Sequence, residues 1–348
     1  MTKAFSGLAI ALDTPPMEAK LASSIPSGPG WQFEPKWDGF RCLAFRDGDA
    51  IELMSKSGKP LARYFPEVVE TLREVEERRF ILDGELVLPV GEVLSFAALQ
   101  LRLHPAASRI ERLSRETPAQ LMLFDCLQVG AEALLQEPLA ERRTELEQFL
   151  HRPAGPRLCL SPATDDPRIA ADWFRRSGKA LDGIVAKRID APYQPGERAM
   201  VKVKQQRTAD CVVGGYRKGK NGVGSLLLGL YDRRGKLDYV GFTSSFTDEA
   251  RAVLSKKLAR DEGTSPFTGT SPGGASRWSQ GRSTEWVSLK GDLVAEVSYD
   301  QVTGGRFRHG TTFLRWRDDK RPDQCTREQL EHELSPAALQ QVFEDAAE

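Results

Sequence analysis

The pattern of apolar residues changes near residue 207, and this change constrains the fold more than any other feature of the sequence. Up to Gln206, segments with apolar residues at helical spacing alternate with strand-like segments, which is typical of a mixed α+β domain. From Ala209 onward, the apolar residues fall in short β-branched stretches broken by glycines. The sequence therefore predicts two domains of different architecture.

The periodicity also places the individual elements. We expect helices at 65–79, 95–103, 139–150, 168–176 and 248–260, and strands within 30–54 and at 80–88, 121–127, 158–161, 183–187, 200–204, 211–216, 226–230 and 293–297. The segment 263–282 is rich in Gly, Ser, Thr and Pro and is expected to be a long loop. These elements predict an α+β domain with antiparallel sheets at 1–206, an OB-fold β-barrel at 207–327 and an acidic helical tail at 328–348.

Composition and charge exclude several classes of site. The five cysteines include no C-x-x-C pair and the four histidines are scattered, which argues against zinc and leaves carboxylates as ligands for any Mg²⁺ or Mn²⁺. No cationic leader or long apolar window is present, so we expect a cytoplasmic protein without a membrane partner. The net charge is zero, but residues 207–327 carry 21 basic and 14 acidic side chains. A local basic surface of this kind is compatible with contact to a phosphate backbone.

One turn in the first domain combines residue types suited to covalent chemistry. Lys36 begins the string Lys-Trp-Asp-Gly-Phe-Arg, directly after a strand-like segment. An unprotonated lysine amine is a nucleophile, and nearby cations such as Lys202 and Lys204 would favour the neutral amine. The alternative interpretation is an ordinary charged turn.

Six further strings follow the lysine turn in order: Ser55-Lys56-Ser57-Gly58-Lys59, Asp83-Gly84-Glu85, Leu123-Phe124-Asp125, Asp182-Gly183-Ile184-Val185-Ala186-Lys187, Lys202-Val203-Lys204 and Arg315-Trp316-Arg317-Asp318-Asp319-Lys320. Together with Lys36, they resemble the motif series of covalent nucleotidyltransferases, specifically the ATP-dependent DNA ligases of the bacterial ligase C and ligase D type. The resemblance runs from Phe33 to about Arg327. It implies an enzyme that seals nicks between 3′-hydroxyl and 5′-phosphate ends through a lysyl-AMP intermediate, in DNA repair or end joining.

The resemblance also implies roles for individual residues. Lys36 would be the catalytic nucleophile, and Glu85 and Asp182 would contact a divalent metal, with Glu85 also near the ribose. Glu34 would lie near the base edge, and Phe124 would stack on adenine, although a core position is its alternative interpretation. The remaining contacts to ATP would come from Arg41, Lys56, Lys202, Lys204, Arg315, Arg317 and Lys320, the last three after a hinge movement near Gln205 to Ala209.

Two positions depart from the commoner pattern of the family. Lys56 stands where an arginine is usual, which reduces a bidentate contact to a point charge. Asp182 stands where glutamate is more frequent, and the shorter side chain makes a water-mediated metal contact an alternative.

The partners implied are ATP, nicked duplex DNA and a possible DNA end-binding protein, for a monomeric, stand-alone, nucleoid-associated enzyme. An mRNA-capping guanylyltransferase that uses GTP and an RNA ligase are the alternatives among enzymes. A nick-recognising binding module is the alternative outside them.

Overall fold

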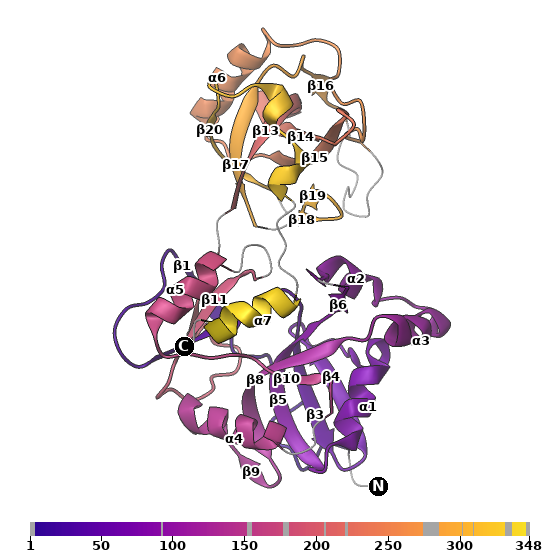
Figure 1. Ribbon diagram of the computed structural model, residues 1–348, viewed down its shortest axis with the longest axis vertical. Helices are drawn as coiled ribbons and strands as arrows, with labels where there is room; N and C mark the ends of the chain where they lie inside the picture. The colour runs from indigo at the N-terminus through magenta and orange to yellow at the C-terminus, as the bar shows by residue number, and fades with distance from the viewer. Residues whose placement is uncertain are drawn as a thin grey trace. The chain divides into compact units, whose positions relative to one another are not determined.

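The computed structural model describes residues 4–91, 93–151, 155–176, 181–204, 207–219, 222–273, 285–300, 302–308, 310–330 and 336–345 (Figure 1). The chain forms two compact units. Unit 1 comprises residues 1–204 and 333–348, and unit 2 comprises residues 205–332. Among the described residues, no helix is both long and apolar enough to cross a membrane.

Unit 1 is built on two large sheets, beside which two short strands form a separate two-stranded sheet. Its strands are β1 (Ala19–Ala22), β2 (Trp31–Lys36), β3 (Phe40–Asp47), β4 (Ala50–Ser55), β5 (Arg79–Val87), β6 (Pro89–Val90), β7 (Val93–Leu94), β8 (Gln120–Val129), β9 (Glu132–Ala133), β10 (Leu158–Leu160), β11 (Gly183–Arg188) and β12 (Met200–Lys204). The smaller sheet has the order β1-β12-β11-β2, and the larger one has the order β10-β8-β5-β3-β4, with β9 beside β8. Most neighbouring pairs are antiparallel, as expected from the sequence; β1 with β12 and β10 with β8 are parallel.

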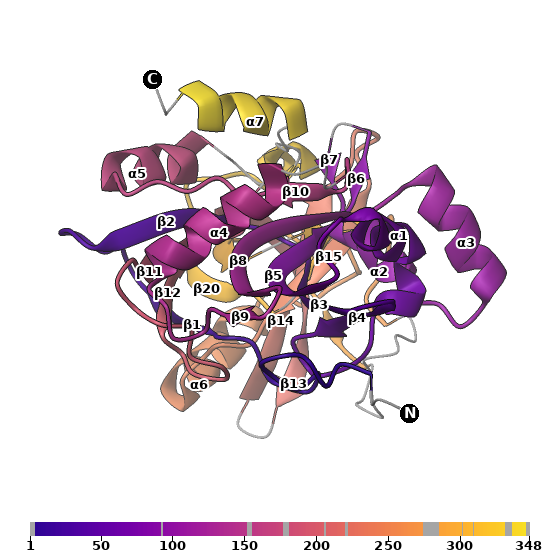
Figure 2. The same ribbon diagram turned by 90° about the horizontal axis from the view of Figure 1, so that it is seen from below.

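Helices cover the outer faces of both sheets. They are η1 (Ala62–Tyr64), α1 (Pro66–Glu74), α2 (Phe96–Leu101), α3 (Ala107–Glu116), α4 (Leu139–His151), α5 (Pro167–Arg176) and α7 (Pro336–Asp345). Side chains of α1 and α4 share one apolar cluster with the larger sheet, whereas α5 and α7 pack against the smaller sheet and lie side by side in both views (Figures 1 and 2). The inner faces of the two sheets meet in a further cluster that includes Leu43, Phe45, Ile81, Val185 and Met200.

The structure corrects the expected helix at 65–79. Helix α1 ends at Glu74, and Val75 is already extended. The guanidinium of Arg46 donates from Nη1 to the carbonyl oxygens of Leu72 (2.8 Å) and Val75 (2.6 Å), which satisfies groups that a longer helix would have bonded internally. Helix α3 was not expected from the sequence.

Unit 2 is a curved antiparallel sheet with few helices. Its elements are β13 (Arg207–Gly219), β14 (Gly222–Tyr231), β15 (Leu237–Thr243), α6 (Asp248–Leu258), β16 (Val287–Ser288), β17 (Val294–Tyr299), β18 (Val302–Thr303), β19 (Arg306–Phe307), β20 (Thr312–Trp316), η2 (Pro322–Gln324) and η3 (Arg327–Leu330). The strand order is β15-β14-β13-β17-β20, with β16 beside β13. Among the described residues, a single bridge, Thr243 with Thr311, links the end of β15 to the residue before β20. In the part of the chain that the structure describes, the barrel is therefore OB-like but not closed by continuous pairing.

Two expected segments lie partly outside the described residues. The described part of the expected loop, 263–273, forms no helix or strand, and residues 274–282 are not described. Of the expected hinge, residues 205–206 are not described, and 207–209 already belong to β13.

Candidate active site

The turn that carries Lys36 passes from the smaller sheet to the larger one. Lys36 is the last residue of β2, and β3 begins four residues later at Phe40. Gly39 is required for the crossing, because a Cβ at this position would lie 2.1 Å from the carbonyl oxygen of Leu86 on β5. Trp37 is buried beneath the turn and donates from Nε1 to Ser161 Oγ at 2.9 Å. The turn thus holds the Lys36 backbone against both sheets.

The register of the smaller sheet places four functional side chains on one face. Lys36, Gly183 and Lys204 lie in one cross-strand row, and Glu34, Val185 and Lys202 lie in the next. Directly paired residues project to the same side of a sheet, and so do residues two apart on one strand. The opposite face carries Phe33, Ile184 and Ala186 into the cluster with α5 and α7. One face is therefore packed against helices, and the other, which faces the larger sheet, carries three lysines and a glutamate.

Asp182 provides the negative charge within this group of cations. Its Oδ2 lies 2.5 Å from Lys36 Nζ and 3.4 Å from Lys204 Nζ, and the residue is 6% exposed. The following Gly183 has a φ of 145°, and a Cβ there would lie 2.0 Å from the carbonyl oxygen of Val203. This close approach between strands brings the carboxylate to the lysines, so Asp182 is an ion-pair partner of the nucleophile candidate.

Lys56 and Lys202 extend the positive region. Lys56 follows β4 and pairs with Glu18 at 3.0 Å, which lowers the pKa of that carboxyl group. Burial lowers the pKa of Lys202, and the charges of Lys36, Lys204 and Lys56 lower it further. Several ammonium groups thus lie close enough to affect one another, an arrangement that would favour a polyanionic ligand.

Arg41 is fixed by a buried acid. Its guanidinium donates from Nε and Nη2 to the two carboxylate oxygens of Asp83, both at 2.6 Å, and Tyr193 donates to Asp83 Oδ2 at 2.6 Å. Burial opposes the charge of Arg41, yet the Asp83 carboxylate raises the pKa of this arginine above its ordinary value. Glu85 lies opposite Arg41 in the register of β3 and β5. Burial raises the pKa of Glu85 to about 7, although the charges of Lys36 and Arg41 act to lower it.

Two cations lie close to the ring of Phe124. Arg41 Cζ is 4.5 Å from the ring centroid, and Lys187 Nζ is 4.6 Å from it. Lys187 also pairs with Glu34 Oε2 at 2.8 Å, while Gln32 Nε2 donates to Glu34 Oε1 at 2.7 Å. Glu34 is 2% exposed, so its carboxylate is held in one orientation by these two neighbours.

Sequence reasoning missed four of these residues: Gln32, Asp83, Lys187 and Tyr193. Asp83 and Lys187 belong to motifs already identified in the sequence, so their position in these motifs could have marked them as site residues. Gln32 lies two residues before Glu34 and therefore shares its face of β2. Tyr193 lies in a segment without helix or strand, and no pattern marked it.

The carboxylates of Glu85 and Asp182 could bind a divalent metal only if a bound nucleotide and water supplied further oxygen ligands. No group of three or more His, Cys, Asp or Glu side chains able to hold a metal occurs among the residues that the structure describes. Glu85 and Asp182 offer the hard oxygen atoms that Mg²⁺ prefers, and phosphate oxygens and water would have to complete the coordination. The residues present are thus compatible with a metal that arrives with a nucleotide.

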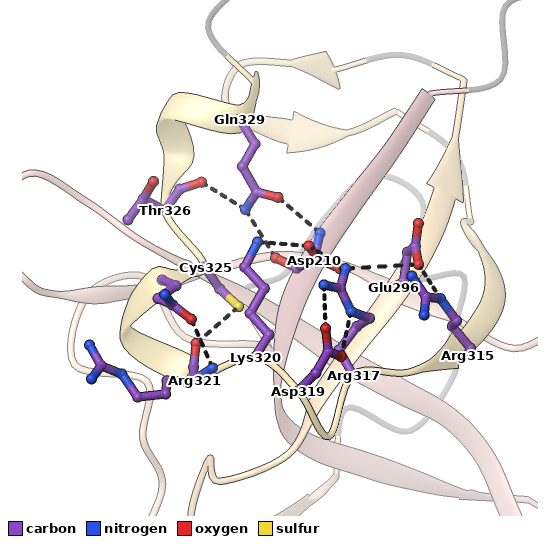
Figure 3. Close-up of polar contacts among 11 residues, drawn as sticks. Asp210, Glu296, Arg315, Arg317, Asp319, Lys320, Arg321, Cys325, Thr326 and Gln329 are labelled. Atoms are coloured by element: carbon purple, nitrogen blue, oxygen red, sulfur yellow. Dashed lines mark hydrogen bonds and ion pairs between the residues drawn. The ribbon is translucent and has the colours of Figure 1, made fainter.

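The last predicted string lies in unit 2, on and after β20. Arg315 pairs with Glu296 at 2.6 Å, Arg317 pairs with Asp210 at 2.9 Å, and Lys320 pairs with the same Asp210 at 2.7 Å (Figure 3). Arg317 also binds Asp319, through Nε at 2.8 Å and Nη2 at 2.9 Å. These cations form one network with carboxylates of their own unit.

Comparisons with known proteins agree on one family. A family model described as "ATP dependent DNA ligase domain" matches residues 16–204, and one described as "ATP dependent DNA ligase C terminal region" matches residues 219–320. DNA ligase C1 of Mycolicibacterium smegmatis is 44% identical over 92% of this chain and 94% of its own length.

Two further relatives extend the comparison. The multifunctional non-homologous end joining DNA repair protein LigD of Mycobacterium tuberculosis is 33% identical over 86% of this chain, which corresponds to 37% of that larger protein. A solved structure from a study of Lig E DNA ligases covers 86% of this chain and 99% of its own, with a TM-score of 0.51 and 16% identity, and shows the same fold. The chain belongs to the ATP-dependent DNA ligases.

Proposed function

We propose that this ATP-dependent DNA ligase seals nicks in duplex DNA through an AMP group carried on Lys36. The observation that carries the proposal is the position of Lys36 in a row of cations, with its amine 2.5 Å from Asp182. A triphosphate would be drawn to Lys36, Lys202 and Lys204, which lie on one face of the smaller sheet. Several like charges on one half-buried face repel each other, and a bound polyphosphate would neutralise this repulsion.

The first step is nucleotidyl transfer. The Lys36 amine forms a bond to the α-phosphorus, the bond to the β-phosphate oxygen breaks, and pyrophosphate leaves. The amine loses its proton, and the Asp182 carboxylate is the acceptor nearest to it. AMP then passes from Lys36 to the 5′-phosphate of a nick, and the 3′-hydroxyl displaces AMP to join the strand. Positioning and charge neutralisation supply most of the acceleration in such transfers.

The base and the metal have separate positions in this proposal. Adenine would stack on Phe124, and the carboxylate of Glu34 would accept from the exocyclic amine, since Lys187 and Gln32 leave it further acceptor sites. Glu85 and Asp182 would hold Mg²⁺ or Mn²⁺, which would neutralise charge on the phosphate oxygens. Arg41, Lys56, Arg315, Arg317 and Lys320 would supply the remaining nucleotide contacts.

The first test is the intact mass of the protein after incubation with magnesium and ATP, GTP or NAD in parallel. We expect an increase of one AMP from ATP alone. Lys36→Arg is the matched variant, because it retains the charge next to Asp182 but has no nucleophilic amine, and it should gain no mass. An adduct on the Lys36→Arg protein would contradict the assignment of the nucleophile, and a GMP adduct would favour a capping enzyme.

The second test concerns the DNA. A nick is defined by its ends and by duplex shape, so we propose that backbone contacts dominate, and sealing at limiting enzyme should fall steeply between roughly 50 and 300 mM salt. Sealing that stays constant over this range would contradict the proposal. The related LigD is named as a non-homologous end joining protein, and on this ground we propose that a DNA end-binding protein recruits the present enzyme. This is tested by whether such a protein increases joining of double-strand ends more than sealing of nicks.

A further inference from the structure

Asp210 occupies a rigid position at the start of unit 2. It lies on β13. In the register of the sheet it lies opposite Glu296 on β17, and Glu296 lies opposite Arg315 on β20. Its backbone N–H donates to Gln329 Oε1 at 2.9 Å, and Gln329 Nε2 donates to its carbonyl oxygen at 3.0 Å. The side chain is 12% exposed. Neither the backbone nor the carboxylate of Asp210 is therefore free to move.

Arg317 and Lys320 both bind the carboxylate of Asp210. Arg317 Nη1 donates to Asp210 Oδ1 at 2.9 Å and to Oδ2 at 3.0 Å, and Lys320 Nζ donates to Oδ2 at 2.7 Å (Figure 3). Lys320 and Arg317 would repel each other at this spacing without the shared anion. Asp210 thus holds the two cations close together and fixes Lys320 relative to the sheet.

The two cations differ in the donors that they still have available. All three guanidinium nitrogens of Arg317 already donate to Asp210 or Asp319. The ammonium group of Lys320 has three donors, and among the described residues its ion pair is with Asp210 alone. Arg315 is similar, since Glu296 is its ion-pair partner in the part of the chain that the structure describes and 62% of its side chain is exposed. Lys320 and Arg315 thus retain more donors for a further anion than Arg317 does.

We propose that Asp210 is a positioning residue for the first step of the reaction, holding Lys320 where it meets the pyrophosphate leaving group. The inference rests on the proposed function, in which Lys320 contacts ATP. Because no pyrophosphate is present when AMP has already been transferred to DNA, Asp210 should matter for the formation of lysyl-AMP and not for the sealing of a pre-adenylated nick.

The experiment measures the two half-reactions separately. Lys36 adenylation is followed by rapid quench across a range of ATP concentrations, and strand joining is followed on a nicked duplex that already carries AMP at its 5′-phosphate. Asp210→Asn should slow adenylation by about 10- to 100-fold, the loss expected when a contacting group is displaced by about 1 Å, and leave joining unchanged. Asp323→Asn is the matched control, because Asp323 pairs with the exposed Arg321 in the same segment and should change neither step.

A double-mutant cycle tests whether Asp210 acts through Lys320. Lys320→Ala should slow adenylation, and the Asp210→Asn/Lys320→Ala protein should be no slower than Lys320→Ala alone. If Asp210→Asn does not fold, Asp210→Glu retains the charge, moves it by one methylene, and should produce a smaller loss restricted to the same step.

Each contrary outcome points to a different failure. Equal losses in both half-reactions, or additive losses in the cycle, would make Asp210 a purely structural residue and overturn the inference. A slow Lys320→Ala protein beside a normal Asp210→Asn protein would overturn the role of Asp210 while retaining that of Lys320. A normal Lys320→Ala protein would remove the proposed contact of Lys320 with ATP and the inference with it, but would leave the AMP adduct on Lys36 as the test of the main proposal.

Discussion

Tyr193 and Asp83 determine the direction in which the Arg41 guanidinium points. Tyr193 donates to Asp83 Oδ2 at 2.6 Å and accepts from the backbone N–H of Met17 at 2.9 Å, and the residue is 2% exposed. Burial raises the pKa of Tyr193 well above its ordinary value, and the Asp83 charge adds to this, so the hydroxyl remains a donor. The site is thus supported from a loop that has no pattern of its own in the sequence.

Replacing Tyr193 by phenylalanine removes only this hydroxyl. The Met17 N–H and one oxygen of Asp83 then lose a buried partner, so the free energy of unfolding should fall by about 1–3 kcal/mol. Urea denaturation of the wild type and of Tyr193→Phe measures the loss, and Tyr64→Phe, at a half-buried position elsewhere in unit 1, is the control. A Tyr193→Phe protein as stable as the wild type would show that water replaces the hydroxyl.

Lys202 provides a test of the charge environment around Lys36. Burial and the charges of Lys36, Lys204 and Lys56 lower its pKa, so a larger fraction of Lys202 is unprotonated at a given pH than of a solvated lysine. Acylation by an amine-reactive reagent, followed by peptide mass spectrometry, should therefore begin at lower pH for Lys202 than for the exposed Lys236. ATP should protect Lys202 and not Lys236. Identical pH profiles for both lysines would contradict the electrostatic description.

At the level of elements, the sequence predicted helices and strands best where apolar periodicity coincides with a recognisable sequence motif. Strand β11 and helix α6 lie where the pattern placed them, and the mixed α+β fold class with a C-terminal OB-like part is confirmed. Helix α1 ends early because a distant arginine, Arg46, satisfies its last carbonyl groups, and a local pattern contains no such information. The pairing of Lys36 with Asp182 depends likewise on the register of β2 and β11, which are far apart in the chain.

Arg102 joins the helices that cover the larger sheet. It is fully buried, pairs with Glu67 of α1 at 2.8 Å, and donates to the carbonyl oxygens of Tyr64 and Thr117. Arg102→Met should lower the free energy of unfolding by about 3–5 kcal/mol, because the Glu67 carboxylate would remain buried without its counter-charge.

The double variant Glu67→Gln/Arg102→Met removes that unpaired charge. It should be more stable than the sum of the two single losses predicts. Thermal unfolding of the three variants tests this, and strictly additive losses would show that the two side chains do not act as a pair.

At the level of the whole molecule, unit 2 lies between two segments of unit 1 in the chain. The chain leaves unit 1 after Lys204 and returns to it at Glu333, where α7 follows. The predicted acidic tail at 328–348 is thus divided, with η3 in unit 2 and α7 in unit 1. Unit 2 contains 21 basic and 16 acidic residues, so the positive charge expected to meet DNA remains there.

Helix α7 reaches the turn of the proposed nucleophile through one aromatic side chain. Leu339, Val342 and Phe343 share one helix face and are buried, and the Phe343 ring lies edge-on to Trp173 at 5.2 Å and to Trp37 at 6.0 Å. Because Trp37 directly follows Lys36, the C-terminal helix supports the turn from behind.

Phe343→Ala should therefore lower the free energy of unfolding by about 3–5 kcal/mol. It should also slow formation of lysyl-AMP, because Trp37 loses a ring that fixes its position and Lys36 is then held less firmly. Chemical denaturation and the adenylation assay measure the two effects, and Gln340→Ala, on the exposed side of α7, should leave both unchanged. A Phe343→Ala protein that is destabilised but adenylates at the normal rate would show that Gly39 and the Trp37–Ser161 hydrogen bond suffice to hold the turn, and that α7 serves the stability of unit 1 alone.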